Sequence, residues 1–351
     1  MIHVVGAGGI GCAVGYALRA AGESVTFVEA NPAKVATGNR DGVKVDDRPA
    51  LQAEFVHFDE WDPPACATVL LCTKCYDNAA VLAKLPPCVE LIPIQNGFDD
   101  RLAAHGHEYE GVASFVSECA PDRPHTRITR AGELHFGRRN LTPLPPSLGR
   151  KGEQEGRAGP VTGRVLGSAP PSFLGKGAGG LGSGLFKVIH VPVIEPFKHA
   201  KLMYNAAISP LAAAAGIDNG QLLSLAPARR LFFTLLQENY RILSVAGIEL
   251  GTVGPFRPRT VAWILRRRWL AGLMAKGFEP SLRGTYCSMA GEIEKGRTEI
   301  DNYNGYLIRV AERTGTPCPL NRAVYDLVTR MTAERATPRR GVLDELAAKI
   351  L

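Results

Sequence analysis

Short apolar runs alternate with helix-period patterns along the first 100 residues of the chain. The runs IHVVGAG, SVTFVEA, ATVLLCT and ELIPIQNG have the length of buried strands and are bounded by glycine or polar residues. Between them, GCAVGYALRAAG and YDNAAVLAKL have the apolar spacing of amphipathic helices. This alternation predicts a doubly wound α/β fold with a parallel sheet. Further on, TRITRAGELHFG at 126–137 predicts two short strands that close this sheet.

Residues 140–184 interrupt the pattern with a segment rich in proline and glycine. It contains two similar stretches, PPSLGRKG at 145–152 and PPSFLGKG at 170–177, and few residues that could build a core. We expect an insertion or linker that is largely disordered. Its GKG is not a phosphate loop, because the glycine spacing is wrong and no Ser or Thr follows the lysine.

The remainder of the chain carries helix-period apolar stripes. They are clearest in FKHAKLMYNAAISPLAAAAG at 197–216, APARRLFFTLLQENYRILSVAG at 226–247 and NRAVYDLVTRMTAER at 321–335. We therefore predict an α/β domain over 1–195, with 140–184 as its insertion, followed by an all-α domain over 196–351. At 351 residues the chain is long enough for two such cores.

One predicted helix places three polar residues along a single face. Lys201, Asn205 and Ser209 are spaced four residues apart, so they stack on one side of a helix whose other positions are mostly apolar. Lys201 alone could extend its stem along the helix and keep its ammonium group in water, which is the commoner arrangement. The repetition of polar residues at 205 and 209 favours a functional surface.

Composition and charge narrow the classes of function only slightly. Hydrophobic residues make up 45% of the chain and charged residues 21%, as in ordinary globular proteins. The net charge of +7 favours acidic ligands, and we interpret the arginine run at 266–268 as a solvated helix face rather than a nucleic-acid site. No apolar run approaches the roughly 20 residues that span a bilayer, and the N-terminus does not resemble a signal peptide. We expect a cytoplasmic protein without membrane contact.

The eight cysteines do not indicate a metal site. Cys72 and Cys75 form a CxxC pair, but no second pair stands at the spacing of a zinc site. Both lie at the end of an apolar run, where small buried thiols are common. We expect reduced cysteines and no bound metal.

The segment GAGGIG at 6–11 has the G-x-G-x-x-G pattern of a dinucleotide-binding turn. A predicted strand precedes it and a predicted helix follows it, which is the context that makes this pattern informative. The first glycine permits a tight turn, the second lets the backbone approach a pyrophosphate, and the third allows close packing of helix and strand. The amide groups of the helix N-terminus then face the phosphates. The predicted cofactor-binding residues of this turn are Gly6, Ala7, Gly8, Gly9, Ile10 and Gly11.

Three residues at strand ends extend the predicted cofactor site. Glu29 ends the second strand, where an acid accepts hydrogen bonds from a ribose 2′-hydroxyl and repels a 2′-phosphate, so it favours NAD over NADP. A solvated acid is the alternative interpretation. Lys74 and Asn96 follow the next two predicted strands and are expected at the same edge of the sheet. Asn96 and Gly97 also form a good turn sequence without any further role.

Together these features resemble the ketopantoate reductases (2-dehydropantoate 2-reductases), relatives of the 6-phosphogluconate-dehydrogenase-like enzymes. The resemblance covers nearly the whole chain apart from 140–184. It implies an N-terminal Rossmann domain, a helical C-terminal domain and an active site in the cleft between them. The implied reaction is the NAD(P)H-dependent reduction of 2-dehydropantoate to pantoate in pantothenate biosynthesis. The matching segments are GAGGIG at 6–11, CTKCYD around Lys74, QNG at 95–97, AKLMYNAAISPLAA at 200–213 and GEIEKGRTEIDNYNG at 291–305.

The resemblance also implies roles for individual residues. Lys201 matches the catalytic lysine, Asn205 the asparagine one turn later, and Glu299 the glutamate that binds the substrate. We expect Lys201 to act as the general acid, with its pKa lowered by partial desolvation. Asn205 would hold the substrate or the lysine, and Glu299 would bind a substrate hydroxyl and anchor the lysine's ammonium group. Further implied substrate contacts are Asn96, Ser209 and Ser288.

Two departures from the family pattern bear on substrate and cofactor. The family usually has a second asparagine at the position of Ser209, and it often has an arginine for the NADP phosphate where this chain has residues 29–31, Glu-Ala-Asn. The resemblance implies NADP(H), whereas Glu29 favours NAD(H). Three interpretations stay open: a 2-dehydropantoate reductase, a reductase of another 2-oxo acid, and a catalytically silent dinucleotide-binding protein. As partners we expect a small 2-oxo acid and no nucleic acid, with a homodimer left open.

Overall fold

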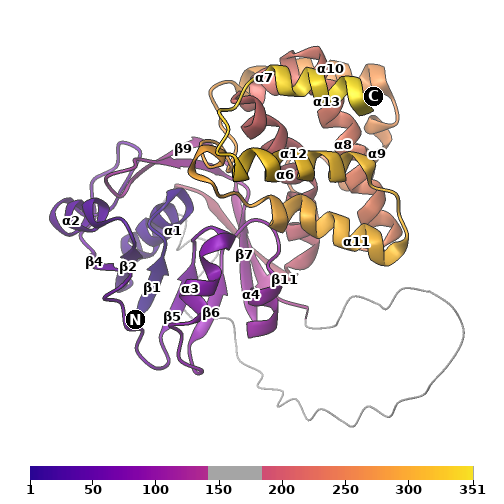
Figure 1. Cartoon of the computed structure of the whole chain (residues 1–351). Coiled ribbons are helices and arrows are strands. Elements are labelled where there is room, and N and C mark those ends of the chain that lie inside the picture. The colour runs from indigo at the N-terminus through magenta and orange to yellow at the C-terminus, as the bar shows by residue number, and fades with distance from the viewer. Residues whose placement is uncertain (141–183, 351) are drawn as a thin grey trace, which may run out of the picture.

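The computed structural model of the chain describes residues 1–140 and 184–350, and its N-terminal half is built on a parallel sheet (Figure 1). The strands follow the order β4-β2-β1-β5-β6, and every neighbouring pair is parallel. The chain moves outward from β1 in both directions, so a binding crevice is expected beyond the carboxyl ends of β1 and β5. The predicted doubly wound architecture is confirmed. The strands are β1 Ile2–Val5, β2 Val25–Glu29, β4 Glu54–His57, β5 Thr68–Leu71 and β6 Glu90–Pro93.

Both faces of this sheet are buried, which explains why its strands are continuous apolar runs. Val4 and Phe27 pack with α1 (Gly9–Ala20) on one face. The next residues along the two strands, Val5 and Val28, point to the opposite face, where they pack with Trp61. The other helical segments of this half are α2 Pro32–Asp41, the 3₁₀ turn Cys75–Asp77, α3 Asn78–Leu82 and α4 Asp100–His105.

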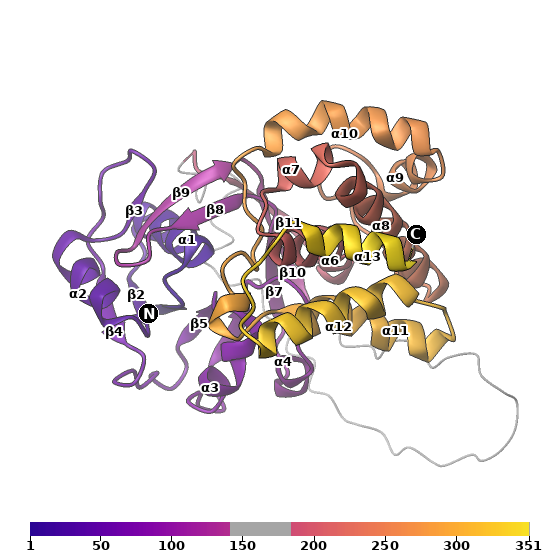
Figure 2. The same ribbon diagram turned by 45° about the horizontal axis from the view of Figure 1, so that its top comes forward.

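Two smaller sheets lie beside the parallel sheet, and they correct one prediction. The segment 126–137 does not close the main sheet, because its two strands, β9 and β10, belong to different small sheets. A Cβ at Gly132 between them would lie 2.4 Å from the backbone nitrogen of Phe115, so the chain crosses the β7–β8 connection there at close range. Figure 2 shows β8 and β9 side by side near α1. The first sheet contains β11 (Lys187–Val193), β10 (Glu133–Arg138) and β7 (Tyr109–Ala113); the second contains β3 (Lys44–Val45), β9 (His125–Arg130) and β8 (Val116–Cys119).

From Glu195 onward the chain is helical, as predicted. The long helix α6 (Glu195–Ala215) packs against α8, α12 and α13 (Figure 1). The domain boundary at 195/196 stays a prediction, and the predicted disordered insertion, 140–184, lies almost wholly outside the described residues. Within the ranges that the structure describes, no helix is long and apolar enough to cross a membrane. The remaining helices are α7 Asn219–Ser224, α8 Ala226–Val245, α9 Pro258–Leu265, α10 Arg268–Leu282, the 3₁₀ turn Ile293–Lys295, α11 Tyr306–Thr314, α12 Pro319–Ala333 and α13 Gly341–Ile350.

A proline inside α6 is compensated by a buried asparagine from a distant segment. Pro210 has no N–H to donate to the carbonyl of Ala206, four residues earlier. Asn304, in the π-helical segment Asp301–Gly305, donates from Nδ2 to that carbonyl at 3.0 Å. The same amide donates to Asn321 Oδ1 at 2.9 Å. These contacts fix α6, and with it the predicted polar face, against the rest of the helical half.

Candidate active site

A cavity of about 1490 Å³ lies between the carboxyl edge of the parallel sheet and the helical half. Its walls include the glycine-rich turn after β1, the loops after β5 and β6, and one face of α6. Of the predicted site residues, Ala7 and Gly11 do not line the cavity. Those that do are Gly6, Gly8, Gly9, Ile10, Glu29, Lys74, Asn96, Lys201, Asn205, Ser209, Ser288 and Glu299.

The glycine-rich turn has the shape that a pyrophosphate site requires. Gly6 has a φ of +96°, and a Cβ at Gly11 would lie 1.9 Å from the carbonyl oxygen of Gly6. A Cβ at Gly8 would meet no atom within 4 Å, so the backbone there borders the open cavity. Among the described residues no side chain caps the N-terminus of α1, which leaves the amide groups of its first turn available to an anion. The turn therefore fits the phosphates of a dinucleotide.

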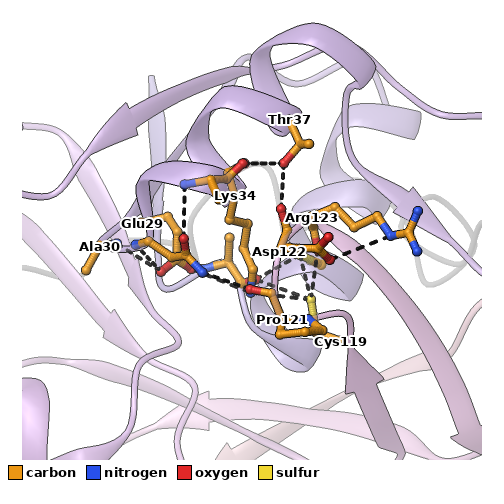
Figure 3. A network of polar contacts seen from close by, with 12 residues as sticks. Glu29, Ala30, Lys34, Thr37, Cys119, Pro121, Asp122 and Arg123 are labelled. Carbon is orange, nitrogen blue, oxygen red and sulfur yellow. Dashed lines mark hydrogen bonds and ion pairs between the residues drawn. The ribbon is translucent and has the colours of Figure 1, made fainter.

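Glu29 lines the cavity, and Figure 3 shows it in a network of polar contacts with Ala30 and Lys34. Its carboxylate accepts hydrogen bonds from the backbone N–H groups of Ala7 at 3.1 Å, Ala30 at 2.9 Å and Asn31 at 3.0 Å. Lys34 of α2 lies 4.0 Å from this carboxylate and donates to the carbonyl of Ala7 at 3.2 Å. These contacts fix the negative charge of Glu29 at the end of β2, where the ribose of a dinucleotide would lie.

A pair of thiols adjoins this network. The Nζ of Lys34 lies 3.7 Å from the Sγ of Cys119, which in turn lies 4.0 Å from the Sγ of Cys12. The hydrogen bond with Cys12 and the charge of Lys34 lower the pKa of the Cys119 thiol, although burial opposes them. Lys34 and Cys119 both line the cavity, and neither was predicted from the sequence. They are 85 positions apart, and no local sequence pattern predicts their contact.

One face of α6 forms a wall of the cavity, and Lys201 is its only cationic residue. Lys201 is partly buried and makes no hydrogen bond or ion pair with any residue that the structure describes. Burial, and then the positive charge of Arg130, lower the pKa of Lys201 to about 8. Near neutral pH the ammonium group therefore holds a proton that it can release more readily than an ordinary lysine. The cavity-lining residues of this face are Lys201, Tyr204, Asn205, Ile208 and Ser209.

The carboxylate of Glu299 pairs with Lys74 rather than with Lys201. Lys74 donates from Nζ to Glu299 Oε2 at 3.0 Å and to the carbonyl of Ser288 at 2.5 Å. Glu292 lies 3.7 Å from the same ammonium group. Although burial opposes it, the charges of Glu299 and Glu292 raise the pKa of Lys74. The expectation that Glu299 anchors Lys201 was wrong, because the loop after β5 places another lysine against the carboxylate.

The loop after β6 joins the cavity to the helical half. Asn96 lines the cavity, and its Oδ1 is buried without a hydrogen-bond partner among the residues described. Gly97 has a φ of +76°, so the Asn-Gly sequence does form a turn. The N–H of Phe98 then donates to the carbonyl of Asn302 at 3.1 Å, and Asn302 Nδ2 donates back to the Phe98 carbonyl at 2.9 Å. The turn thus holds Asn96 at the cavity wall, with its amide oxygen buried.

Several residues that line the cavity were not predicted from the sequence. Arg130 at the end of β9 and Lys187 in β11 bring positive charge to the cavity that contains Lys201. Asn219 of α7 contributes a buried amide oxygen, also without a partner in the described ranges. Tyr204 could have been found from the helical spacing of Lys201. Arg130 and Lys187 could not, because the small sheets that position them depend on pairing between distant segments.

Two family models together cover most of the chain. Residues 2–140 match the model described as ketopantoate reductase PanE/ApbA, and residues 194–332 match the model described as ketopantoate reductase PanE/ApbA C terminal. The chain belongs to the ketopantoate reductase PanE/ApbA family. As a member of this family it is a dinucleotide-dependent oxidoreductase acting on CH–OH groups.

Curated relatives are similar at low identity. A 2-dehydropantoate 2-reductase of Archaeoglobus fulgidus is 23% identical over 332 residues, which cover 93% of this chain and 96% of that protein. A 2-dehydropantoate 2-reductase of Pyrobaculum aerophilum is 29% identical over 135 residues, which cover 38% of this chain but only 43% of that protein. The first match spans both halves of the fold, and the second is partial.

Solved structures share the architecture of the whole chain. D-mandelate dehydrogenase in a complex with NADH and anilino(oxo)acetate has a TM-score of 0.69 at 18% identity. A PanE/ApbA family ketopantoate reductase from Ralstonia eutropha has a TM-score of 0.68 at 21% identity. Each match covers 95% of this chain and 99% of the other. A dimeric ketopantoate reductase from Staphylococcus aureus has a TM-score of 0.64 at 15% identity. At these identities the likeness shows the fold.

Proposed function

We propose that this enzyme reduces the ketone of a 2-oxo acid to the 2-hydroxy acid, with Lys201 as the general acid and 2-dehydropantoate as the first candidate substrate. The product would then be pantoate, for pantothenate biosynthesis. The observation that carries the proposal is the position of Lys201: a partly buried ammonium group with no partner among the described residues and with a pKa of about 8, in the same cavity as the glycine-rich turn. The family and the curated relatives named above support it.

The residues around the glycine-rich turn fit the dinucleotide. The open backbone at Gly8 and the uncapped N-terminus of α1 would hold its phosphates, and Glu29 would face its adenosine ribose. Asn96 lines the cavity at the carboxyl edge of the sheet and would contact the nicotinamide end or the substrate. The reduced dinucleotide supplies the hydride for the reaction.

Lys201 meets the charge that develops on the substrate oxygen. A ketone that accepts hydride gains negative charge on its oxygen, and a nearby ammonium group both stabilises that charge and donates the proton. Asn205, one turn further along the same face of α6, would orient the substrate by hydrogen bonding. Ser209 and Ser288 are the further hydroxyl groups proposed to contact the substrate.

The other charges in the cavity have separate roles in this proposal. Arg130 of β9 and Lys187 of β11 line the same cavity as Lys201 and would attract the substrate carboxylate. Lys74 is already paired with Glu299, so its charge is fixed and it is not the proton donor. Glu299 keeps its proposed role of accepting a hydrogen bond from a substrate hydroxyl, and Lys74 holds its carboxylate in position.

The choice between the two nicotinamide cofactors depends on opposing indications. The family resemblance favours NADP(H), whereas the fixed carboxylate of Glu29 favours NAD(H) because it would repel a 2′-phosphate. Solved neighbours include a complex with NADH. The ratio of kcat/KM for NADPH and NADH measures this preference directly.

Initial rates of NADPH and NADH oxidation with 2-dehydropantoate test the proposal. We expect cofactor-dependent formation of pantoate by the wild-type enzyme. Lys201→Met should lower kcat by about 10²–10⁴-fold, the usual contribution of a general acid, while the dissociation constant of the dinucleotide stays close to that of the wild type. A Lys201→Met enzyme that keeps wild-type kcat would disprove the role of Lys201. Dinucleotide binding without reduction of any 2-oxo acid would disprove the function.

A further inference from the structure

The two ends of the cavity differ sharply in chemistry. The end formed by the sheet edge and its loops is lined by charged residues, among them Glu29, Lys74, Arg130 and Lys187. Between Asn205 and Ser288, in contrast, none of the described residues that line the cavity carries a charge. The cavity is thus polar beside the glycine-rich turn and Lys201 and apolar where it extends into the helical half.

The apolar end, which we call the apolar chamber, is enclosed by α8, α9, α10 and the segment 251–257 between α8 and α9. Its side chains are mostly aromatic and aliphatic, and they come from elements that also form the helical core. Its polar lining residues include Asn219 of α7, Thr285 and Tyr286, and the N–H of Asn219 donates to the carbonyl of Thr285 at 3.0 Å. The principal lining residues are Phe232, Leu236, Phe256, Ile264, Ala275 and Phe278.

Helix α6 connects the reacting end of the cavity with the apolar chamber. Lys201 and Ser209 lie on the same face, eight residues apart, which corresponds to about 12 Å along the helix axis. A substrate with its ketone at Lys201 and its carboxylate at Arg130 would have its third substituent free to extend along α6 past Asn205. Ser209 lines this route and has a small side chain, so it adds little bulk there.

We propose that the apolar chamber binds the side chain of the substrate, and that this enzyme reduces 2-oxo acids that carry a large apolar group, either an aromatic ring or an extended alkyl chain. This inference rests on the proposed reduction of 2-oxo acids and names the substrate class of that site. The stoichiometry is that of the same reaction: the dinucleotide gives the hydride, the protein gives the proton, and the ketone becomes a secondary alcohol.

Burial of apolar surface explains the expected preference. Each methylene group moved from water into an apolar pocket is worth roughly a four-fold gain in affinity. A polar side chain would instead lose its hydration and find few partners among the residues that line the apolar chamber. The value of kcat/KM should therefore rise with each methylene group of the alkyl chain until the apolar chamber is filled.

A homologous series of substrates tests the inference on the wild-type full-length chain. We would measure kcat/KM, with the better of the two cofactors, for straight-chain 2-oxo acids from pyruvate to 2-oxooctanoate, for phenylglyoxylate and for 2-dehydropantoate. The expected result is a rise of roughly four-fold per methylene group, and a phenylglyoxylate value at least ten-fold above that of pyruvate. A flat or falling series would overturn the inference.

Variants that alter the volume of the apolar chamber provide a second test. Ala275→Leu adds bulk to the cavity wall and should lower the ratio of kcat/KM for 2-oxooctanoate to that for pyruvate at least ten-fold. Phe278→Ala removes bulk from the same wall and enlarges the apolar chamber. The alkyl chain length with the highest kcat/KM should therefore increase. Leu273→Ser is the matched control, because Leu273 is 61% exposed on the same helix and does not line the cavity, so the ratio should stay within two-fold.

The outcomes separate this inference from the function on which it rests. Reduction of pyruvate or 2-dehydropantoate with no gain for longer or aromatic acids would keep the proposed function and overturn the apolar chamber as a substrate site. No reduction of any 2-oxo acid, with dinucleotide binding intact, would overturn both. If Ala275→Leu does not fold, the wild-type series and Phe278→Ala still decide the inference.

Discussion

The Nζ of Lys74 and the Oε2 of Glu299 lie 3.0 Å apart, across 225 positions of sequence. Lys74 follows β5 in the α/β half, and Glu299 precedes the π-helical segment of the helical half. The side chain of Glu299 is 3% exposed, whereas that of Lys74 is 33% exposed on the cavity side. This ion pair therefore joins the two halves at the wall of the active-site cavity.

Removing one partner of this pair should destabilise the protein. Lys74→Met leaves the buried carboxylate of Glu299 without its cation, and such losses cost about 3–5 kcal/mol in fully buried pairs. Because Lys74 is one-third exposed, solvent screening should reduce the cost to about 1–3 kcal/mol. Thermal unfolding of Lys74→Met, Glu299→Gln and the double variant should show that the double variant is more stable than the sum of the single losses predicts. The matched control is Arg322→Met, whose partner Glu312 lies 2.8 Å away on the surface and whose loss should leave thermal unfolding close to that of the wild type. Strict additivity in the Lys74–Glu299 cycle would contradict the coupling.

Asn304 donates to the Ala206 carbonyl that Pro210 leaves without a backbone donor, and this contact gives a second stability prediction. Asn304→Ala leaves the Ala206 carbonyl buried without a donor, and we expect a loss of about 1–3 kcal/mol. Pro210→Ala restores a backbone N–H that can reach the same carbonyl. In the Asn304→Ala background, Pro210→Ala should therefore recover part of the lost stability, measured by urea unfolding against both single variants. If Pro210→Ala has the same effect in both backgrounds, the compensation between these residues is absent.

The elements that could be predicted from the sequence are those that depend on residues close together in the chain. The glycine-rich turn, the strand that ends at Glu29 and the polar face of α6 each depend on spacing within about ten residues, and the structure contains all three. Turn and helix geometry follow from such spacing because they involve neighbouring residues only.

What the sequence could not predict depends on contacts between distant segments. Glu299 contacts Lys74 rather than Lys201, and a family resemblance alone does not reveal which lysine a carboxylate will meet. The small sheets place Arg130 near Lys201 through pairing of β8 with β9, which no periodic pattern specifies. The apolar chamber likewise arises from α8, α9 and α10 together, while each helix alone shows only an ordinary apolar stripe.

Neutralising Glu29 should shift the cofactor preference toward NADPH. Glu29→Gln keeps one oxygen, which can accept the N–H groups of Ala30 and Asn31 as Oε1 does, but it loses the acceptor for the N–H of Ala7 and removes the negative charge. We expect the ratio of kcat/KM for NADPH to that for NADH to rise about ten-fold, because repulsion of the 2′-phosphate is of the order of 1.4 kcal/mol in a partly solvated site. Glu54→Gln is the matched control, since Glu54 lies on the adjacent strand and does not line the cavity. An unchanged ratio in Glu29→Gln would show that Glu29 does not govern this preference.

Cys119 should be the thiol that a bound dinucleotide protects. It lines the cavity, and the neighbouring Cys12 and Lys34 lower its pKa, so it should react with iodoacetamide as the thiolate. Peptide mapping by mass spectrometry should show that saturating dinucleotide slows alkylation of Cys119 at least ten-fold. In the absence of the dinucleotide, Lys34→Met should slow the alkylation of Cys119.

Cys66 and Cys88, which are exposed and outside the cavity, serve as internal controls and should be labelled equally in both conditions. Equal labelling of Cys119 with and without dinucleotide would place the ligand elsewhere.

The pH dependence of ketone reduction should report the titration of Lys201. The general acid must be protonated, so kcat/KM should be level below the pKa of about 8 and should fall as pH rises through it. Arg130→Gln removes a positive charge that disfavours the ammonium form of Lys201, so the protonated form persists to higher pH. The descending limb of the profile should therefore move to higher pH.

Arg127→Gln is the matched control on the same strand, because Arg127 pairs with Glu118 at 3.3 Å and does not line the cavity. Its profile should coincide with that of the wild type. A limb that stays in place in Arg130→Gln, or that persists in the residual activity of Lys201→Met, would assign the titration to another group.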